Sequence, residues 1–187
     1  MKKFFMEKYN KPKNIRYASF KFTINLFIQR KLKIIVETGT ARGKTKFFFF
    51  NTFNWKDGMS TPMFADLALE IDGQLHTCDI SKKNMNNAKK FTNKDVKFYV
   101  EDSLSFLKNF PTKIDLLYLD SLDGHDPVAA SEHQLSEASL AMGKLHENSL
   151  ILLDDKGTKT NLSITFLLKN NFEILFETDF QVLLGKK

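Results

Sequence analysis

The sequence predicts an α/β fold in which a mostly parallel sheet of seven strands carries helices on both faces and ends in an antiparallel C-terminal strand. Three observations predict it. Short apolar or β-branched runs alternate with amphipathic segments, as is typical of right-handed crossovers between parallel strands. The last two apolar runs are separated only by Thr178 and Asp179, too short a corner for a helical crossover, so they pair antiparallel. The 187 residues match the length of one domain.

Each strand is predicted from a short apolar run and each helix from apolar residues at helical spacing, such as Phe20, Ile24 and Phe27 in the first helix. The strands are expected over residues 33–37, 74–79, 96–100, 114–120, 149–154, 172–177 and 180–184. The helices are expected over residues 15–30, 63–71, 81–91, 103–110, 128–145 and 161–170. No linker or repeat divides the chain, so we expect a single domain over residues 1–187 with an N-terminal helical extension over residues 1–31.

Composition excludes several classes of protein. A single cysteine, Cys78, rules out an intramolecular disulfide and a multi-cysteine zinc site. No run of about 18 apolar residues is present, so no membrane span is expected, and the apolar patch at residues 4–6 is too short for a signal-peptide core. We therefore expect a cytoplasmic protein. The net charge of +6 is spread along the chain, which favours a solvated surface over a nucleic-acid site without excluding the latter.

Carboxylates follow all five of the strands that precede the final pair. In an open α/β sheet, ligands bind beyond the carboxyl ends of the strands, so these residues predict the position of a site. They are Glu37, Asp79, Glu101 with Asp102, Asp120, and Asp154 with Asp155.

The turn after the first strand indicates the kind of ligand. Gly39 and Gly43 allow a close approach of the backbone, but the pattern is neither a dinucleotide fingerprint nor a P-loop. Glu37 suits a cationic group better than a pyrophosphate. Asp79 is placed to accept hydrogen bonds from a ribose, and Asp102 lies one strand further, where an adenine amino group would lie. S-adenosylmethionine combines these features.

These residues, from Val36 to Gly43 together with the acids of the later strands, resemble the class I S-adenosylmethionine-dependent methyltransferases, which have a Rossmann-like fold. The likeness is greatest to small O-methyltransferases of the macrocin and catechol types, and it extends from Ile34 to the C-terminus. It implies a methionine-end site, a ribose site at Asp79, and an adenine site. The residues implied are Glu37, Gly39, Thr40, Ala41 and Gly43 for the first, Asp79, Ile80 and Ser81 for the second, and Asp102 and Ser103 for the third. Asp120 is a further implied cofactor-binding residue. Two alternatives stay open: the glycine turn is an ordinary strand-to-helix turn, or Asp79 is a helix cap.

The sequence departs from this family after Gly43, where an aromatic segment over residues 44–60 delays the next helix. Ser60 and Thr61 precede Pro62, which is typical of a helix start. We expect both hydroxyls to return to the carboxylate of the cofactor and the inserted loop to form a lid over the methyl group. The alternative for Phe47–Phe50 is a buried run or a homodimer contact.

Asp120, Asp154 and Asp155 end adjacent strands, and three crowded carboxylates require a cation or protons. Oxygen ligands suit Mg²⁺, and the resemblance implies an ion at these positions. The catalytic lysine of the catechol-type enzymes is missing after Asp120, so Asp120 and His125 are the candidate catalytic residues, with His125 as the base. The alternatives are an exposed loop histidine and a metal-free acidic pair.

The sequence thus predicts transfer of a methyl group from S-adenosylmethionine to an oxygen of a small-molecule or sugar acceptor, assisted by Mg²⁺. The alternatives are a nucleic-acid methyltransferase, a module that binds the cofactor without turnover, and a nucleotide-dependent oxidoreductase. The segment after the fourth strand lacks the motif of amino-directed DNA and RNA enzymes.

Overall fold

The computed structural model describes residues 4–47, 50–92 and 95–187. Its main sheet has seven strands in the order β5-β4-β1-β6-β7-β9-β8, and β9 is antiparallel to both of its neighbours while the others pair parallel. The predicted fold class is confirmed. The strands are β1 Ile34–Thr38, β4 Gln74–Cys78, β5 Lys97–Tyr99, β6 Ile114–Leu119, β7 Leu145–Asp154, β8 Phe172–Glu177 and β9 Gln181–Lys186.

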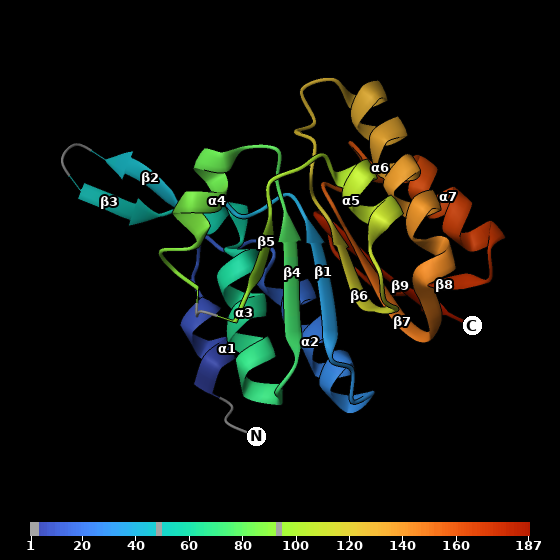
Figure 1. The fold of residues 1–187 in the computed structure, drawn as a ribbon, viewed down its shortest axis with the longest axis horizontal. Helices are drawn as coiled ribbons and strands as arrows, with labels where there is room; N and C mark the ends of the chain where they lie inside the picture. The colour runs from blue at the N-terminus through green and yellow to red at the C-terminus, as the bar shows by residue number, and fades with distance from the viewer. Residues whose placement is uncertain (1–3, 48–49, 93–94) are drawn as a thin grey trace.

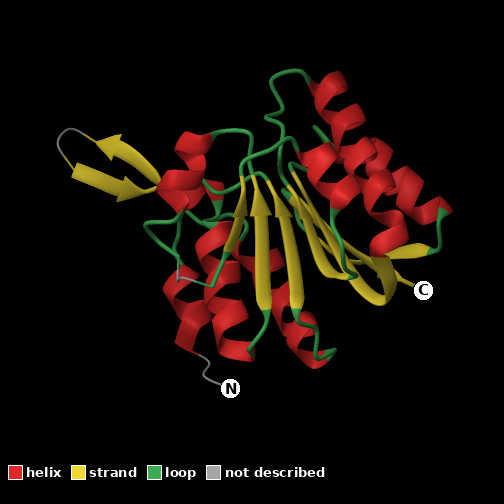
Figure 2. Ribbon diagram, viewed as in Figure 1, coloured by secondary structure: helices red, strands yellow, loops and turns green. Residues whose placement is uncertain are grey.

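Helices cover both faces of the sheet (Figure 2). All six predicted helices form. The described residues also contain α1 and two short 3-10 turns, which were not predicted. The helices are α1 Phe4–Tyr9, α2 Tyr17–Gln29, α3 Ser60–Ile71, α4 Lys82–Ala88, α5 Ser103–Asn109, α6 Pro127–Ala141 and α7 Thr160–Lys169, and the 3-10 turns are η1 Trp55–Asp57 and η2 Met142–Lys144. The helix expected up to residue 145 ends earlier because β7 begins at Leu145, opposite Ile114, ahead of a register shift.

The core divides into two layers because successive side chains of a strand point to opposite faces. In β6, Leu116 and Tyr118 pack in the cluster that includes residues of α1, α2 and α3. Leu117 and Leu119 pack in the cluster on the other face, with residues of α5, α6 and α7. Both faces are apolar, which explains why the central strands read as continuous apolar runs.

The parallel strands end in register at one edge of the sheet. Thr38 is paired with Cys78 on one side and with Leu119 on the other. The ladder continues one residue further, since the amide of Gly39 donates to the carbonyl of Cys78 at 2.9 Å and that of Asp120 to Thr38 at 3.0 Å. The residues directly after these strands therefore start from one common edge, at the top of Figure 1.

The segment over residues 44–60, expected to be an inserted loop, instead contains a hairpin followed by the turn η1. β2 Lys44–Phe47 and β3 Phe50–Phe53 pair antiparallel as a separate two-stranded sheet, which projects away from the body of the molecule (Figure 1). The threonine and aromatic residues of this segment are types that favour strands. Phe48 and Phe49, within the predicted aromatic lid, lie outside the described residues. The role of lid stays a prediction.

Among the described residues, no helix has the length and apolar character needed to cross a membrane.

Candidate functional site

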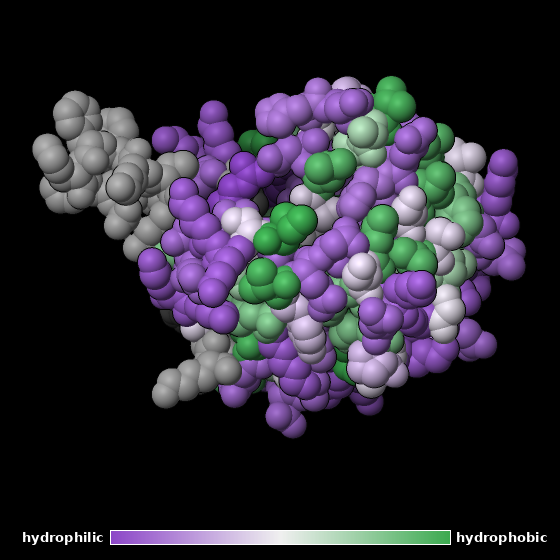
Figure 3. Space-filling model, turned by 45° about the horizontal axis from the view of Figure 1, so that its top comes forward, coloured by the Kyte–Doolittle hydropathy of each residue, from purple (hydrophilic) through white to green (hydrophobic). Residues whose placement is uncertain are grey.

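A cleft of about 730 Å³ lies at the strand tips and collects most of the predicted site residues. Figure 3, in which the top of the molecule is turned forward, shows that the surface around the hollow at this end is mainly hydrophilic. A smaller cavity of about 140 Å³ adjoins it and shares Gly39, Asp79 and Ile80. The cleft is lined by the predicted residues Gly39, Thr40, Ala41, Asp79, Ile80, Ser81, Asp120, His125 and Asp155. The smaller cavity adds Asp102 and Ser103.

The glycine turn brings the backbone of the first loop against the end of β6. Gly39 has φ +82°, and a Cβ at this position would lie 2.0 Å from the carbonyl oxygen of Asp120. A side chain is therefore excluded by both conformation and space. Gly43 also has a positive φ and packs against the ring of Phe91, but it does not line the cleft.

Glu37 was predicted to contact the ligand, but its side chain lies beneath the cleft and is fully buried. Its carboxylate accepts hydrogen bonds from the hydroxyls of Ser60 at 2.6 Å, Thr61 at 2.7 Å and Thr77 at 2.7 Å. Because these donors supply its polar contacts inside the protein, Glu37 supports the loop and does not face a bound cation. Burial raises its pKa to about 7, while the three hydroxyl donors act in the opposite direction.

Ser60 and Thr61 do return to the first loop, but they bind the protein itself. Thr61 accepts a hydrogen bond from the amide of Ala41 at 2.8 Å while it donates to Glu37. Neither hydroxyl caps α3, whose N-cap is Met59 with φ +53°, and both side chains are buried. The predicted contact with the carboxylate of a cofactor is thus replaced by a network that fixes the loop.

Asp79 lines both cavities and also shapes the turn after β4. Its carboxylate accepts from the amide of Ser81 at 2.6 Å and from the side chain of Asn84 at 3.1 Å. The cap of α4 itself is Ser81, which accepts from the amide of Asn84. Each oxygen of Asp79 makes one hydrogen bond, so lone pairs remain on both oxygens toward the cleft. Ile80, next to it, is 79% exposed.

The smaller cavity has polar groups from two helices. Asp102 caps α5 by accepting from the amide of Ser105 at 2.9 Å, and this hydrogen bond lowers its pKa. Ser103 Oγ lies 3.0 Å from Nε2 of His133 on α6, and the carboxylate of Glu137, 3.6 Å from the same nitrogen, raises the pKa of that histidine. His133 is half-buried and lines this cavity.

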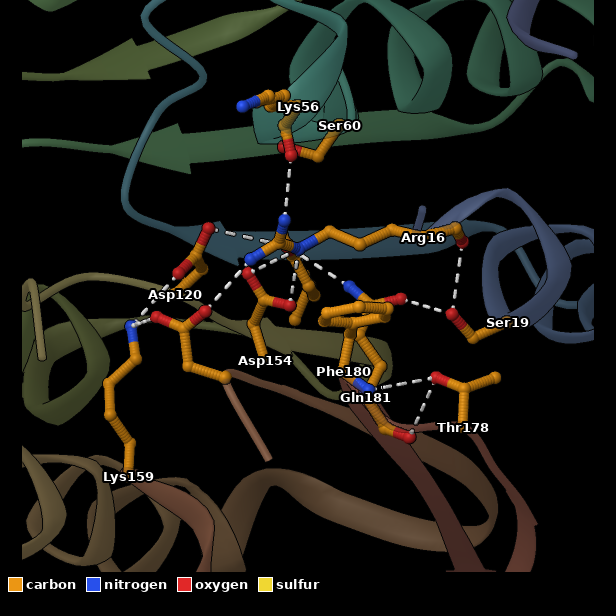
Figure 4. Close-up of polar contacts among 12 residues, drawn as sticks. Arg16, Ser19, Lys56, Ser60, Asp120, Asp154, Lys159, Thr178, Phe180 and Gln181 are labelled. Atoms are coloured by element: carbon orange, nitrogen blue, oxygen red, sulfur yellow. Dashed lines mark hydrogen bonds and ion pairs between the residues drawn. The ribbon is translucent and has the colours of Figure 1, made fainter. Parts of the chain in front are cut away.

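Asp120, Asp154 and Asp155 come together as predicted, with ligand atoms within 4.8 Å of one another. Two cations that the sequence analysis missed lie among them (Figure 4). Arg16 donates through Nε to both oxygens of Asp154 at 2.7 and 2.9 Å and through Nη2 to Asp155 at 2.8 Å. Lys159 lies 3.0 Å from Asp120 and 2.9 Å from Asp155. The side chains of Arg16 and Lys159 are only 12% and 3% exposed.

The electrostatics of this group keep both cations charged. Burial opposes the charge of Arg16 and of Lys159, but the adjacent carboxylates outweigh it and raise the pKa of each. Desolvation at the base of the cleft raises the pKa of Asp120 well above its usual range, and Asp154 adds to this effect while Lys159 opposes it. Asp120 therefore binds a proton more readily than an ordinary aspartate.

A second layer holds Asp120 in place. The hydroxyl of Tyr118 donates to Asp120 at 3.3 Å and accepts from the amide of Gln181 at 3.3 Å, and Gln181 accepts from Ser19. Buried Gln134 donates to the carbonyls of both Leu119 and Asp154 at 3.4 Å. The tips of β6 and β7 are thereby joined to each other and to α2.

His125, the predicted base, lies in the loop between β6 and α6 at the exposed rim of the cleft. Arg42 on the opposite rim pairs with Asp123 of the same loop. His125 therefore stays a candidate on position alone, whereas Asp120 lies at the base of the cleft.

The comparison with known families agrees with this arrangement. A family described as a methyltransferase domain matches residues 36–156. The chain belongs to this methyltransferase family. The match spans the strand tips from β1 to β7, and the predicted membership of the class I S-adenosylmethionine-dependent methyltransferases is confirmed.

No curated protein matches the sequence, but solved structures share the fold. The methyltransferase PaMTH1 of Podospora anserina, bound to S-adenosylhomocysteine, has a TM-score of 0.66 at 14% identity over 98% of this methyltransferase and 86% of its own chain. An O-methyltransferase of Bacillus cereus, in complex with the same compound, has a TM-score of 0.62 at 14% identity, over 97% of this chain and 90% of its own. A ribosomal protein L11 methylase of Lactobacillus delbrueckii has a TM-score of 0.58 at 14% identity, over 91% of this chain and 79% of its own. Enzymes with different acceptors thus share this fold.

The raised pKa of Glu37 predicts a pH-dependent contribution to stability. The folded protein holds this proton more tightly than the unfolded chain, so stability falls as pH rises from about 4.5 to about 7, by about 3 kcal/mol. Glu37→Gln cannot ionise and should lose less stability over this range. Urea unfolding of both proteins at about pH 5 and about pH 8 measures the difference, with Glu132→Gln, exposed on α6, as control. Equal pH dependence in the parent and Glu37→Gln would contradict the assignment.

Gly39→Ala should destabilise the methyltransferase by about 4 kcal/mol or more, because a clash with the backbone of Asp120 adds to the cost of a positive φ. Gly157 is a matched control, since it has φ +83° but an added Cβ meets no described atom within 4 Å. Gly157→Ala should therefore cost only the conformational part, about 1–2 kcal/mol. Urea unfolding measures both losses of stability. Equal losses would show that the close approach of Gly39 to the backbone of Asp120 does not exclude a side chain.

Proposed function

We propose that this methyltransferase moves a methyl group from S-adenosylmethionine to a hydroxyl oxygen of a small-molecule acceptor, a sugar or another hydroxyl-bearing compound. The observation that carries the proposal is the cleft at the strand tips, where the Gly39 turn, Asp79 and Asp120 face one space next to the cavity of Asp102. Its volume lies within the range of small-molecule sites.

The two cavities suit the two ends of the donor. Asp79 retains lone pairs for ribose hydroxyls, and exposed Ile80 offers an apolar surface for a base. Asp102 and Ser103 supply polar atoms for the amino group of an adenine in the smaller cavity. The backbone of Gly39 to Ala41 lines the larger cleft and leaves space there for the methionine end.

Asp120 is the residue that we assign to proton transfer. The donor supplies an electrophilic methyl group on a positive sulfur, and in the reaction the acceptor oxygen bonds to that carbon as the carbon–sulfur bond breaks. The hydroxyl proton passes to the carboxylate of Asp120. A carboxylate with a raised pKa is a better base than an ordinary one near neutral pH, and alignment in the cleft supplies much of the remaining acceleration.

The acceptor class is inferred from the charges of the cleft. Its lining includes Asp79, Asp120, Asp123, Asp126 and Asp155, against Arg16 and Arg42. This excess of carboxylates disfavours a polyphosphate chain and favours a neutral or cationic compound with hydroxyl groups. The O-methyltransferase of Bacillus cereus supports an oxygen acceptor by analogy of fold. The proposed reaction uses no divalent cation, since Arg16 and Lys159 already pair with the carboxylates predicted to bind it.

Asp79→Ala should weaken the binding of S-adenosylmethionine roughly tenfold or more, because hydrogen bonds to a charged group contribute about 1.5–3 kcal/mol. Titration calorimetry measures the affinity, and thermal unfolding checks that the variant is folded. Asp115→Ala is the matched control, because Asp115 also accepts backbone hydrogen bonds, from Lys33 and Ile34, but stands near the start of β6 and lines neither cavity. No binding by the parent would refute the proposed function, and equal affinity of Asp79→Ala would refute the ribose assignment alone.

Asp120→Asn should lower kcat roughly 10²–10⁴-fold and abolish the rise of rate with pH, because only the ionised carboxylate accepts a proton. Since the pKa of Asp120 is raised, the parent should gain activity as pH increases through that pKa. Release of S-adenosylhomocysteine is measured with catechols and sugars, and the profile is taken on the acceptor that turns over. His125→Gln is the comparison: loss of the pH profile there, with retention in Asp120→Asn, would assign the base to His125.

A further inference from the structure

Every oxygen of the three clustered carboxylates already accepts a hydrogen bond from a protein donor. Arg16 contacts both oxygens of Asp154 and one of Asp155. Lys159 contacts the other oxygen of Asp155 and one of Asp120, and the hydroxyl of Tyr118 contacts the last. Figure 4 shows the guanidinium of Arg16 beside Asp154 and Asp120, and the ammonium of Lys159 beside Asp120. Three carboxylates thus face two positive charges within the cluster.

Both cations stand where local helix chemistry disfavours them. Arg16 is the N-cap of α2 and Lys159 the N-cap of α7, and neither makes a side-chain cap hydrogen bond. Short polar or acidic residues stabilise this position, and the helix dipole repels a cation there. A basic residue at both sites costs helix stability, so the contacts with the carboxylates account for its presence.

Both cations also come from outside the region that defines the family. The matched residues 36–156 contain all three carboxylates, whereas Arg16 precedes this region and Lys159 lies after it. The segments that flank the shared domain in this chain therefore supply the positive charge for the acids within it.

A magnesium ion does not fit this arrangement. Mg²⁺ requires an octahedron of oxygen ligands at about 2.0–2.1 Å. An ion bound to these carboxylates would lie next to a guanidinium and an ammonium that are almost removed from water, where repulsion is screened little. Arg16 cannot relieve the repulsion by losing its proton.

We propose that Arg16 and Lys159 take the place of a divalent cation among Asp120, Asp154 and Asp155, so that the site works without a metal ion. The inference deepens the proposed function, since it specifies how the acidic cluster of the methyl-transfer site is neutralised. It makes Arg16 and Lys159 positioning residues: Lys159 orients Asp120, and Arg16 holds Asp154 and Asp155 together.

The test measures metal binding directly. Mn²⁺, a spectroscopic probe for Mg²⁺ sites, is titrated into the full-length protein, and its electron paramagnetic resonance signal reports the free ion. The parent should leave Mn²⁺ free, with or without S-adenosylhomocysteine. Arg16→Met, which keeps the apolar stem but removes the charge, should bind Mn²⁺ roughly tenfold more tightly or better. Asp154→Asn added to Arg16→Met should abolish the gain, which locates the ion at the cluster.

Each outcome decides the proposal. Tight binding of Mn²⁺ by the parent that Asp154→Asn removes would overturn it, and this comparison needs no Arg16 variant, should that variant fold poorly. Absence of binding in both the parent and folded Arg16→Met would overturn the role of Arg16. Calorimetry with S-adenosylmethionine in the presence of a chelator tests the proposed function separately: retained affinity supports metal-free donor binding whatever the Mn²⁺ result.

Discussion

The pairing of three converging carboxylates with Arg16 and Lys159 is the constraint on which the rest of the site depends. Parallel strands that end in register bring Asp120, Asp154 and Asp155 to one point, and crowded carboxylates repel one another unless cations compensate them. Asp154 is 1% exposed, so water cannot screen its charge. The compensation comes from the starts of α2 and α7. The positions of these two helices relative to the sheet are therefore tied to the charge of the cleft.

Beneath the cleft, a second buried carboxylate organises the loop that approaches the donor. Glu37 joins the start of α3 to β4 through three hydroxyls, and Thr61 extends this network to the amide of Ala41. A buried carboxylate costs stability unless its hydrogen bonds are complete. Here the hydrogen-bond network of this carboxylate holds the backbone of Gly39 and Ala41, which line the site, in its observed geometry. The two acidic groups serve different ends: one fixes the loop, and the other forms the floor of the cleft.

Local pattern was sufficient to predict the sheet and the residues at its edge, because an apolar run ended by an acid specifies both a buried strand and the carboxylate at its tip. It was not sufficient where long-range contacts decide. Arg16 and Asp154 are 138 residues apart, and no periodicity relates them. The orientation of Glu37 depended on which neighbours would offer hydroxyls, so a residue assigned to the ligand proved to be a support. One signal was available: two helices begin with a basic residue in the position that normally carries a cap.

Arg16 also connects the cleft to the inserted segment, because its Nη1 donates to the carbonyl of Lys56 at 2.7 Å. Arg16, the N-cap residue of α2, thus contacts both the end of β7 and the turn η1, which leads from the hairpin to α3. Movement of the insertion relative to the cleft must either carry this side chain along or break its hydrogen bond to Lys56. Carrying it along would uncover Asp154, whereas breaking the bond exposes only one neutral acceptor. The second course costs less, since an unpaired buried charge is far more expensive than a carbonyl that water can reach. The bond to Lys56 is therefore the weaker of the two links of Arg16, and the contacts with Asp154 and Asp155 hold its guanidinium at the floor of the site.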